Sequence, residues 1–290
     1  METRTDMPWT VTRLRVFCHD GSGGNPLPLV LHAEGMQDGD MFRLARDNNS
    51  ECCFVFAPTS VDEKINFHFR FFVPRHEMEM CGHATIGALW LLRESGRIDN
   101  GACIIKTLSG LVTGYVGSDI KISQPLGHVS PVGQHIDEIL SVLRIQAEDL
   151  RDVPIQNATT SRTKTLIPLK TPADVNALQP DFDRIAQLCE AINSTGLYPY
   201  APVNGSDTTF EARQFPARAG FQEDAATGVA AAALARGCIE NGTIKAPDAP
   251  ITIFQGRAMG SLSAIHVAIE TAADGSPSGL RLSGRVMYDN

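Results

Sequence analysis

Three titratable side chains stand where acid/base chemistry could take place. Glu51 opens an apolar segment, and partial desolvation there would raise its carboxyl pKa toward neutrality, as a proton-shuttling carboxylate requires. His83 and Asp224 each lie at the start of a segment of helical character. Each residue also has a plainer interpretation: an exposed strand-start glutamate, a histidine tied to a backbone carbonyl, and a helix N-cap. The sequence alone favours the plainer interpretation for Glu51 and divides evenly for His83.

The two helix starts are themselves candidate binding sites. They read Gly82-His83-Ala84-Thr85 and Ala226-Thr227-Gly228. The free N–H groups and the dipole of a helix N-terminus favour a carboxylate or another anion, and glycine lets a ligand approach the backbone. One such motif would be interpreted as an ordinary cap. Two copies favour a shared site for a small anionic substrate.

Other reactive residues receive structural interpretations. Cys81 precedes a helix start, where a thiol can act as a base, but the matching position in the second half carries no cysteine. We therefore interpret Cys81 as a small buried residue and Glu223 as a solvated neighbour of Asp224. His76 and His83 form no metal-ligand motif, so the sequence predicts no metal. It also contains no nucleotide-binding glycine loop and no nucleophile elbow, so we expect no cofactor.

Two similar segments indicate the elements that must position these residues. The segments 70–92 and 213–234 both begin with a basic and aromatic strand, pass through an acidic loop and reach Ala-Thr before a run of small and apolar residues. Such a run is typical of an enclosed helix, predicted over residues 85–93 and 225–238. The sequence therefore predicts an α+β fold of two similar lobes, each a curved, mostly antiparallel sheet or barrel around a central helix.

Composition limits the remaining possibilities. The 290 residues suit two lobes, which we place at 1–125 and 126–290 with the terminal strands able to cross between them; residues 124–133 are the best linker candidate. A net charge of -8 argues against nucleic acid as a partner. Seven scattered cysteines, the absence of a secretory signal and the absence of a long apolar run predict a cytoplasmic protein without a membrane partner.

Several ordered motifs resemble those of the PhzF-like family of phenazine-biosynthesis isomerases. That family shares the diaminopimelate epimerase fold with epimerases and proline racemases, and the resemblance runs nearly from end to end. The matching pieces are Gly24-Asn25-Pro26, Asn49-Ser50-Glu51, Arg70-Phe71-Phe72-Val73-Pro74, Glu77, Cys81-Gly82-His83-Ala84-Thr85, Glu223-Asp224-Ala225-Ala226-Thr227-Gly228, Gln255-Gly256 and Met259-Gly260.

The resemblance implies a cofactor-independent isomerase or epimerase, a cleft between the lobes and a homodimer. It implies that Glu51 moves a proton from one carbon to another, as in trans-2,3-dihydro-3-hydroxyanthranilate isomerisation, with support from His83 and Asp224. The implied substrate-binding positions are Gly82, Ala84, Thr227, Gly228 and Val229.

Three departures from the family pattern bear on the substrate. Val229 stands where the family often has serine, Ser261 stands where it often has arginine, and Asn49-Ser50-Glu51-Cys52 stands where it often has Leu-Ser-Glu-Thr. Two alternatives follow: a non-catalytic protein that binds a small ligand on the same scaffold, and an amino-acid racemase or epimerase. The missing second cysteine disfavours a two-thiol racemase.

Overall fold

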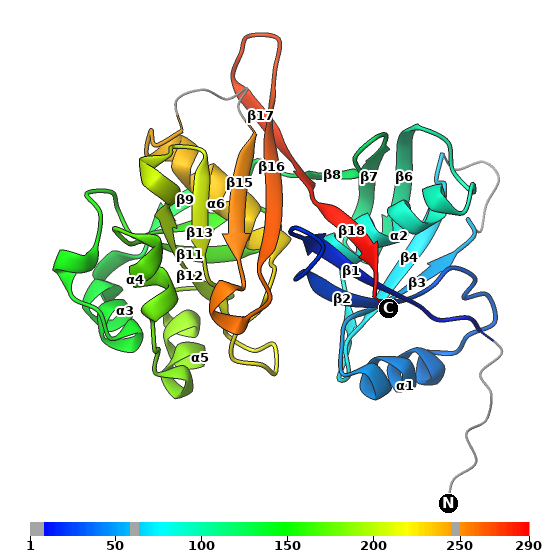
Figure 1. The fold of residues 1–290 in the computed structure, drawn as a ribbon, viewed down its shortest axis with the longest axis horizontal. Coiled ribbons are helices and arrows are strands. Elements are labelled where there is room, and N and C mark those ends of the chain that lie inside the picture. The colour runs from blue at the N-terminus through cyan, green and yellow to red at the C-terminus, as the bar shows by residue number, and fades with distance from the viewer. Residues whose placement is uncertain (1–8, 59–63, 245–249, 290) are drawn as a thin grey trace, which may run out of the picture. The chain divides into compact units, whose positions relative to one another are not determined.

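The computed structural model describes residues 9–58, 64–244 and 250–289 (Figure 1). The chain divides into two compact units. Unit 1 comprises Met1–Val16, Asn25–Ile122 and Arg285–Asn290, and unit 2 comprises Phe17–Gly24 and Ser123–Gly284. The C-terminal residues thus return to the unit that holds the N-terminal strand. In the described ranges, no helix combines the length and the apolar character needed to cross a bilayer.

Unit 1 combines parallel and antiparallel strand pairs with two helices in its described residues. Its elements are β1 (Thr12–Cys18, the last two residues belonging to unit 2), β2 (Asn25–Val30), α1 (Asp38–Asn48), β3 (Cys52–Phe56), β4 (Phe67–Phe72), β5 (Glu77–Met78), α2 (Gly82–Glu94), β6 (Gly101–Thr107), β7 (Gly110–Val116), β8 (Lys121–Gln124, the last two residues again belonging to unit 2) and β18 (Arg285–Tyr288). Most neighbouring strands are antiparallel, whereas β2 with β3 and β4 with β6 are parallel.

The helix α2 is enclosed because its sequence is apolar on every side. Nine of its 13 residues are buried, and it contacts β2, β3, β7 and β18. Alternation in β1 turns Leu14 and Val16 toward it. A Cβ atom on Gly87 would lie 2.4 Å from Leu27 Cδ2, so glycine lets the sheet approach the helix this closely.

Unit 2 combines parallel and antiparallel strand pairs with four α-helices in its described residues. Its elements are β9 (His128–Pro131), η1 (Gly133–His135), α3 (Ile136–Leu143), η2 (Ala147–Asp149), β10 (Gln156–Thr159), β11 (Thr163–Pro168), α4 (Pro172–Ala177), α5 (Phe182–Ala191), β12 (Gly196–Pro202), η3 (Val203–Gly205), β13 (Thr209–Ala212), β14 (Phe215–Pro216), α6 (Gly228–Glu240), β15 (Ile251–Gln255), η4 (Arg257–Met259), β16 (Ser263–Thr271) and β17 (Pro277–Ser283). The helices α3, α4 and α5 lie along one side of this unit (Figure 1).

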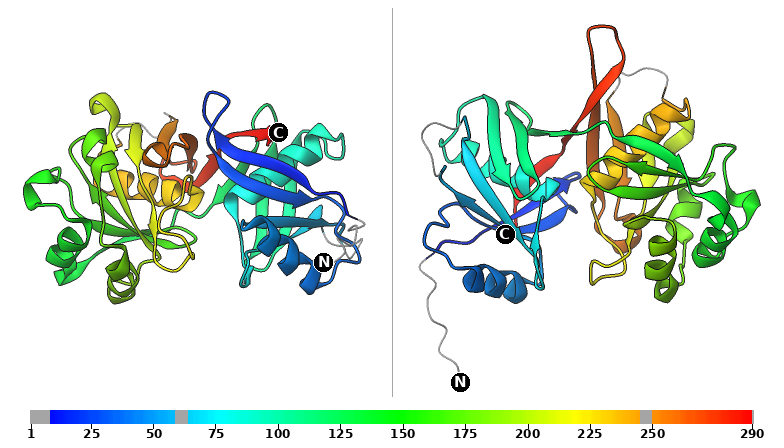
Figure 2. Two further views of the ribbon diagram at one scale, coloured as in Figure 1. Left: turned by 60° about the horizontal axis from the view of Figure 1, so that its bottom comes forward. Right: turned by 180° about the vertical axis from the view of Figure 1, so that it is seen from behind.

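The helix α6 has the same enclosed position in unit 2 that α2 has in unit 1. Nine of its 13 residues are buried, and its contacts include β9, β10, β11, β16 and β17. Figure 2 shows α6 with strands of its own unit around it. A Cβ atom on Gly228 would lie 2.4 Å from Leu282 Cδ2, which explains the glycine at the first turn. Both units therefore enclose a central helix, as the sequence predicts.

The order of strand pairing repeats between the units. In unit 1, β2 is parallel to β3, β3 antiparallel to β4, β4 parallel to β6, and β6 antiparallel to β7. In unit 2, β11 is parallel to β12, β12 antiparallel to β13, β13 parallel to β15, and β15 antiparallel to β16. The enclosed helix stands at the same place in both orders, before β6 and before β15. The similar segments in the sequence thus reflect a repeated fold.

The segment 124–133 is more ordered than a linker. The strand β9 lies inside it and pairs with β10, with Asn157 opposite Ser130. Gly127 turns the chain between β8 and β9 with a φ of +70°, and its Cβ position lies 1.7 Å from the carbonyl oxygen of Thr159. The short strand escapes sequence detection because its proline and histidine disguise a four-residue pairing segment.

The contact at Gly127 predicts a large cost for a methyl group. Gly133 is the matched control, since its φ is +67° and no atom lies within 4 Å of its Cβ position. Gly133→Ala should cost only the left-handed backbone penalty of about 1–2 kcal/mol. Gly127→Ala must also displace backbone, which should add about 2 kcal/mol. Urea unfolding of both variants would measure the difference, and equal midpoints would refute the predicted clash.

Candidate active site

Glu51 is held between the end of α1 and the buried strand β3. Asn49 ends the helix in the left-handed conformation, at a φ of 44°, and the Ser50 hydroxyl donates to the Pro26 carbonyl oxygen at 3.3 Å. Cys52 and the strand beyond it are buried, so the backbone of Glu51 is anchored on both sides. The Glu51 side chain is 27 % exposed. It is therefore a partly covered carboxylate that solvent can still reach.

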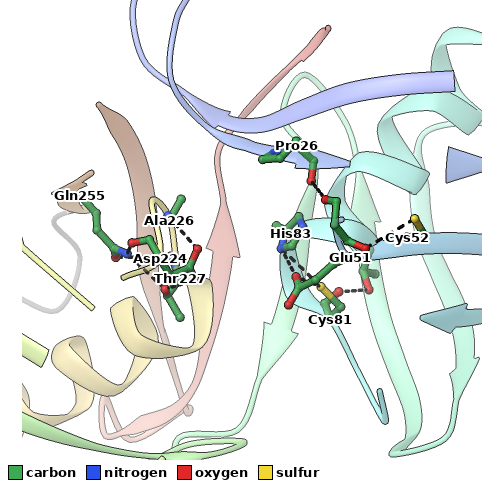
Figure 3. Close-up of polar contacts among 11 residues, drawn as sticks. Pro26, Glu51, Cys52, Cys81, His83, Asp224, Ala226, Thr227 and Gln255 are labelled. Atoms are coloured by element: carbon green, nitrogen blue, oxygen red, sulfur yellow. Dashed lines mark hydrogen bonds and ion pairs between the residues drawn. The ribbon is translucent and has the colours of Figure 1, made fainter. Parts of the chain in front are cut away.

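The first turn of α2 brings two side chains to Glu51. Glu51 Oε2 lies 3.3 Å from Cys81 Sγ and 3.4 Å from His83 Nδ1, and the latter two atoms lie 3.4 Å apart. Cys81 is the N-cap of the helix and His83 is its second residue. Figure 3 shows the three side chains pointing toward one another. The structure thus brings Glu51 and His83 together within unit 1 and adds Cys81, which the sequence analysis treats only as a small buried residue.

The Cys81 thiol is a proton donor in this cluster. Burial, and then the charge of Glu51, raise the pKa of Cys81 well above its ordinary value. Burial likewise raises the pKa of the neighbouring Cys52 to about 12. Both thiols therefore stay protonated at neutral pH, whereas a thiolate base needs a lowered pKa. The cluster provides a carboxylate that accepts from a thiol and faces an imidazole.

Asp224 belongs to a separate cluster in unit 2, at the start of α6. The actual N-cap is Thr227, so the interpretation of Asp224 as the cap is wrong. Asp224 instead accepts from the Thr227 hydroxyl and, at 3.4 Å, from the Ala226 N–H group. Gln255 Nε2 donates to the Asp224 carbonyl oxygen at 2.7 Å (Figure 3). The Tyr198 hydroxyl donates to Gln255 Oε1 at 2.9 Å. With these bonds before it, α6 begins at Gly228, three residues after the start predicted from the sequence.

The remaining predicted binding positions lie on the first turns of the two helices. Gly82 opens α2, Gly228 opens α6, and Val229 follows it; Ala84 is buried and Thr227 is half-buried. Among the described residues, the N–H groups of Gly82, Gly228 and Val229 have no protein acceptor. They can each donate to an anion. Each unit therefore offers amide donors beside its own acidic residue.

The loop before each enclosed helix is fixed by an equivalent ion pair. Arg70 Nε and Nη2 donate to the two Glu77 carboxylate oxygens, both at 2.7 Å. Arg213 donates in the same two-pronged way to Glu223, at 2.8 and 2.7 Å. Each guanidinium also lies over a phenylalanine two residues further along its strand, at 5.0 and 4.8 Å from the ring centroid. The two similar segments thus share the same contact between an arginine on the strand and a glutamate in the loop.

Glu223 is consequently a buried partner, which corrects its interpretation as a solvated neighbour. Its side chain is 11 % exposed, and that of Arg213 is 6 % exposed. The sequence signal that could have revealed this is the alignment with Glu77, since both glutamates follow an Arg-x-Phe strand. Next to Asp224, this pair positions the loop that leads into α6.

Neutralising Glu223 should destabilise the protein because it leaves a buried guanidinium without its charge partner. We expect Glu223→Gln to lower the free energy of unfolding by about 3 kcal/mol. The equivalent change Glu77→Gln affects a pair that is about twice as exposed or more, and it should cost only about 1 kcal/mol. Parallel urea titrations would check the ranking, which fails if Glu77→Gln costs as much as Glu223→Gln.

Comparisons with known proteins agree with this fold. The family model for phenazine biosynthesis-like proteins, PhzC-PhzF, matches residues 14–288. An uncharacterized isomerase of Clostridium acetobutylicum is 30% identical over 288 residues, which covers 93% of each chain. Trans-2,3-dihydro-3-hydroxyanthranilate isomerase of Pseudomonas chlororaphis is 28% identical over 259 residues, 87% of each chain.

Solved structures show the same architecture. A PhzF-family protein of Bacillus anthracis superposes with a TM-score of 0.86 at 22% identity, covering 97% of this chain and 96% of that one. A probable proline racemase of Agrobacterium radiobacter superposes with a TM-score of 0.56 at 11% identity, covering 96% and 90%. The fold is thus the α+β architecture shared by PhzF proteins and proline racemases, as expected.

These findings establish the class. The chain belongs to the PhzF family of phenazine biosynthesis-like proteins, and it is an isomerase of that family. The predicted resemblance and the predicted enzyme class are confirmed.

Proposed function

We propose that this protein is a cofactor-independent isomerase in which the Glu51 carboxylate moves a proton between two carbons of a small, carboxylate-bearing substrate. The observation that supports the proposal most is the placement of Glu51 Oε2 within 3.4 Å of both Cys81 Sγ and His83 Nδ1. A positioned carboxylate of this kind can accept a proton at one carbon and return it at another.

The neighbours of Glu51 have distinct proposed roles. The protonated Cys81 thiol donates to the carboxylate and fixes its orientation, so the carboxylate faces the substrate in one geometry. His83 can donate to Glu51 or to a substrate oxygen, depending on its tautomer. The amide of Gly82 would bind substrate carboxylate.

The first turn of α6 in unit 2 is proposed as a second position that can hold an anion. The amides of Gly228 and Val229 are available as donors, and Asp224 is held in place by Thr227 and Ala226. The relative from Pseudomonas chlororaphis, by its name, isomerises trans-2,3-dihydro-3-hydroxyanthranilate. A compound of this class, a carboxylate next to a carbon that can lose a proton, is the proposed substrate.

The experiment is an assay of the purified protein with trans-2,3-dihydro-3-hydroxyanthranilate and with a panel of small carboxylates that includes L-proline. We expect turnover of a cyclic or unsaturated carboxylate without added metal or cofactor. Stereoinversion of proline would instead favour the racemase alternative. Saturable ligand binding without any product from the panel would favour the non-catalytic alternative that Val229 suggests.

A further inference from the structure

The three atoms that meet at Glu51 have the chemical composition of a transition-metal site. Glu51 offers a carboxylate oxygen, Cys81 a thiol sulfur and His83 an imidazole nitrogen. A carboxylate, a thiolate and an imidazole are all ligands of Zn²⁺, and thiolate in particular selects Zn²⁺ over Mg²⁺ or Ca²⁺. The sequence gives no hint of this site because Glu51 lies 30 residues before Cys81 and the three ligands follow no ligand motif.

The distances between the three ligand atoms also fit a zinc site. The O–S, S–N and N–O separations are 3.3, 3.4 and 3.4 Å. Tetrahedral zinc with bonds of 2.0–2.3 Å separates neighbouring ligand atoms by about 3.3–3.6 Å. An ion slightly off the plane of the three atoms would therefore reach all of them at about 2.0–2.3 Å. Little movement of the side chains is required.

The scaffold around the ligands is rigid on one side and accessible on the other. Cys81 and His83 are both buried and share the first turn of α2, where the Thr85 hydroxyl donates to the Cys81 carbonyl oxygen at 2.8 Å. Glu51 is the exposed member of the three. An ion could enter past Glu51, and its fourth position would face solvent or substrate.

We propose that Glu51, Cys81 and His83 form an inhibitory binding site for a thiophilic divalent cation, with Zn²⁺ as the fitting ion. Binding replaces the thiol proton by the metal and releases that proton to solvent. The bound metal then coordinates the Glu51 carboxylate oxygen, so this oxygen is no longer available to carry a proton in the proposed isomerisation. Metal binding itself does not depend on the proposed function; only its inhibitory effect does.

The test is a titration of the full chain, without a histidine tag and with a phosphine reductant, by Co²⁺ followed by Zn²⁺ competition. One equivalent of Co²⁺ should produce a thiolate-to-cobalt charge-transfer band, and Zn²⁺ should abolish it, whereas Mg²⁺ should not. Cys81→Ser should eliminate the band, and Glu51→Gln and His83→Gln should each weaken binding at least about tenfold. Cys103→Ser alters another buried cysteine of unit 1 and should leave the titration unchanged.

Two results would overturn the site: no band with the unaltered chain, or a band and Zn²⁺ affinity that survive Cys81→Ser. Circular dichroism of each variant would separate loss of a ligand from loss of the fold. With a substrate available, Zn²⁺ should inhibit turnover over the same concentration range in which it binds, and a chelator should restore activity. Binding with no turnover in any assay would refute the proposed function while leaving the metal site intact.

Discussion

Glu51→Gln should lower kcat by about a thousandfold, within the range of 10²–10⁴ that positioned acid/base groups contribute. The amide has the shape of the carboxylate, and its carbonyl oxygen can still accept from the Cys81 thiol that now lies 3.3 Å from Oε2. It cannot accept and return a proton near neutral pH. The variant should therefore keep its fold and its substrate binding while losing turnover.

The matched control for this substitution is Glu79→Gln. Glu79 is an exposed glutamate in the loop before α2, and it takes no part in the Glu51 cluster. The Glu79→Gln variant should retain full activity. Steady-state kinetics of the two variants, with unfolding midpoints measured alongside, would separate the loss of a proton carrier from a general effect of charge. Full activity in Glu51→Gln would remove Glu51 from the mechanism.

Lys164→Met should stabilise the protein at neutral pH by up to about 3 kcal/mol. Lys164 lies in β11 with only 5 % of its surface exposed, and its ammonium makes no hydrogen bond or ion pair with the described residues. Burial lowers the pKa of Lys164 from 10.5 to about 8, although the charge of Asp224 acts in the opposite direction. A difference of this size corresponds to about 3 kcal/mol of cost for keeping the amine charged in the folded state.

The pH dependence of this gain has a definite sign. Below pH 8 the amine is charged in both states, so the folded state bears the whole cost. Between about pH 8 and 10.5 the folded protein releases the proton that the unfolded chain still holds, so the cost falls as pH rises. The advantage of Lys164→Met should therefore be largest at pH 7 and should shrink toward pH 10.5.

Urea unfolding at pH 7 and pH 9.5 would measure this change. Lys106→Met is the control, because Lys106 is exposed in β6 and its replacement should change stability by no more than about 0.5 kcal/mol at either pH. A Lys164→Met variant that is less stable than the unaltered chain at pH 7 would show that the charged amine contributes favourable interactions in the fold.

The repeated segments carried most of the fold information in the sequence. The shared order of a basic-aromatic strand, an acidic loop and a small-residue helix is enough to predict two similar units with enclosed helices. The structure explains why an arginine and a glutamate recur in both segments. Arg70 with Glu77, and Arg213 with Glu223, anchor the two loops in the same way. The burial of Glu223 depends on its pairing with Arg213, and a glutamate next to Asp224 gives no sign of that contact in the sequence.

The candidate site could be predicted only in part. Position alone marks Glu51 and His83 only as candidates, and the family resemblance assigns their roles. Their approach to within 3.4 Å depends on how β3 packs beside α2. The contact between Cys81 and Glu51 cannot be predicted for the same reason, because it spans 30 residues of sequence. Long-range contacts of this kind leave no periodic pattern in a sequence.

The most direct test of the proton-shuttle account is isotope incorporation during turnover in D₂O. With a substrate from the carboxylate panel, the unaltered protein should place one solvent deuterium at the newly protonated carbon, as mass spectrometry and NMR would show. Glu51→Gln should lose this incorporation together with turnover. Turnover at the normal rate in Glu51→Gln, or deuterium incorporation that persists in that variant, would contradict the central role of Glu51.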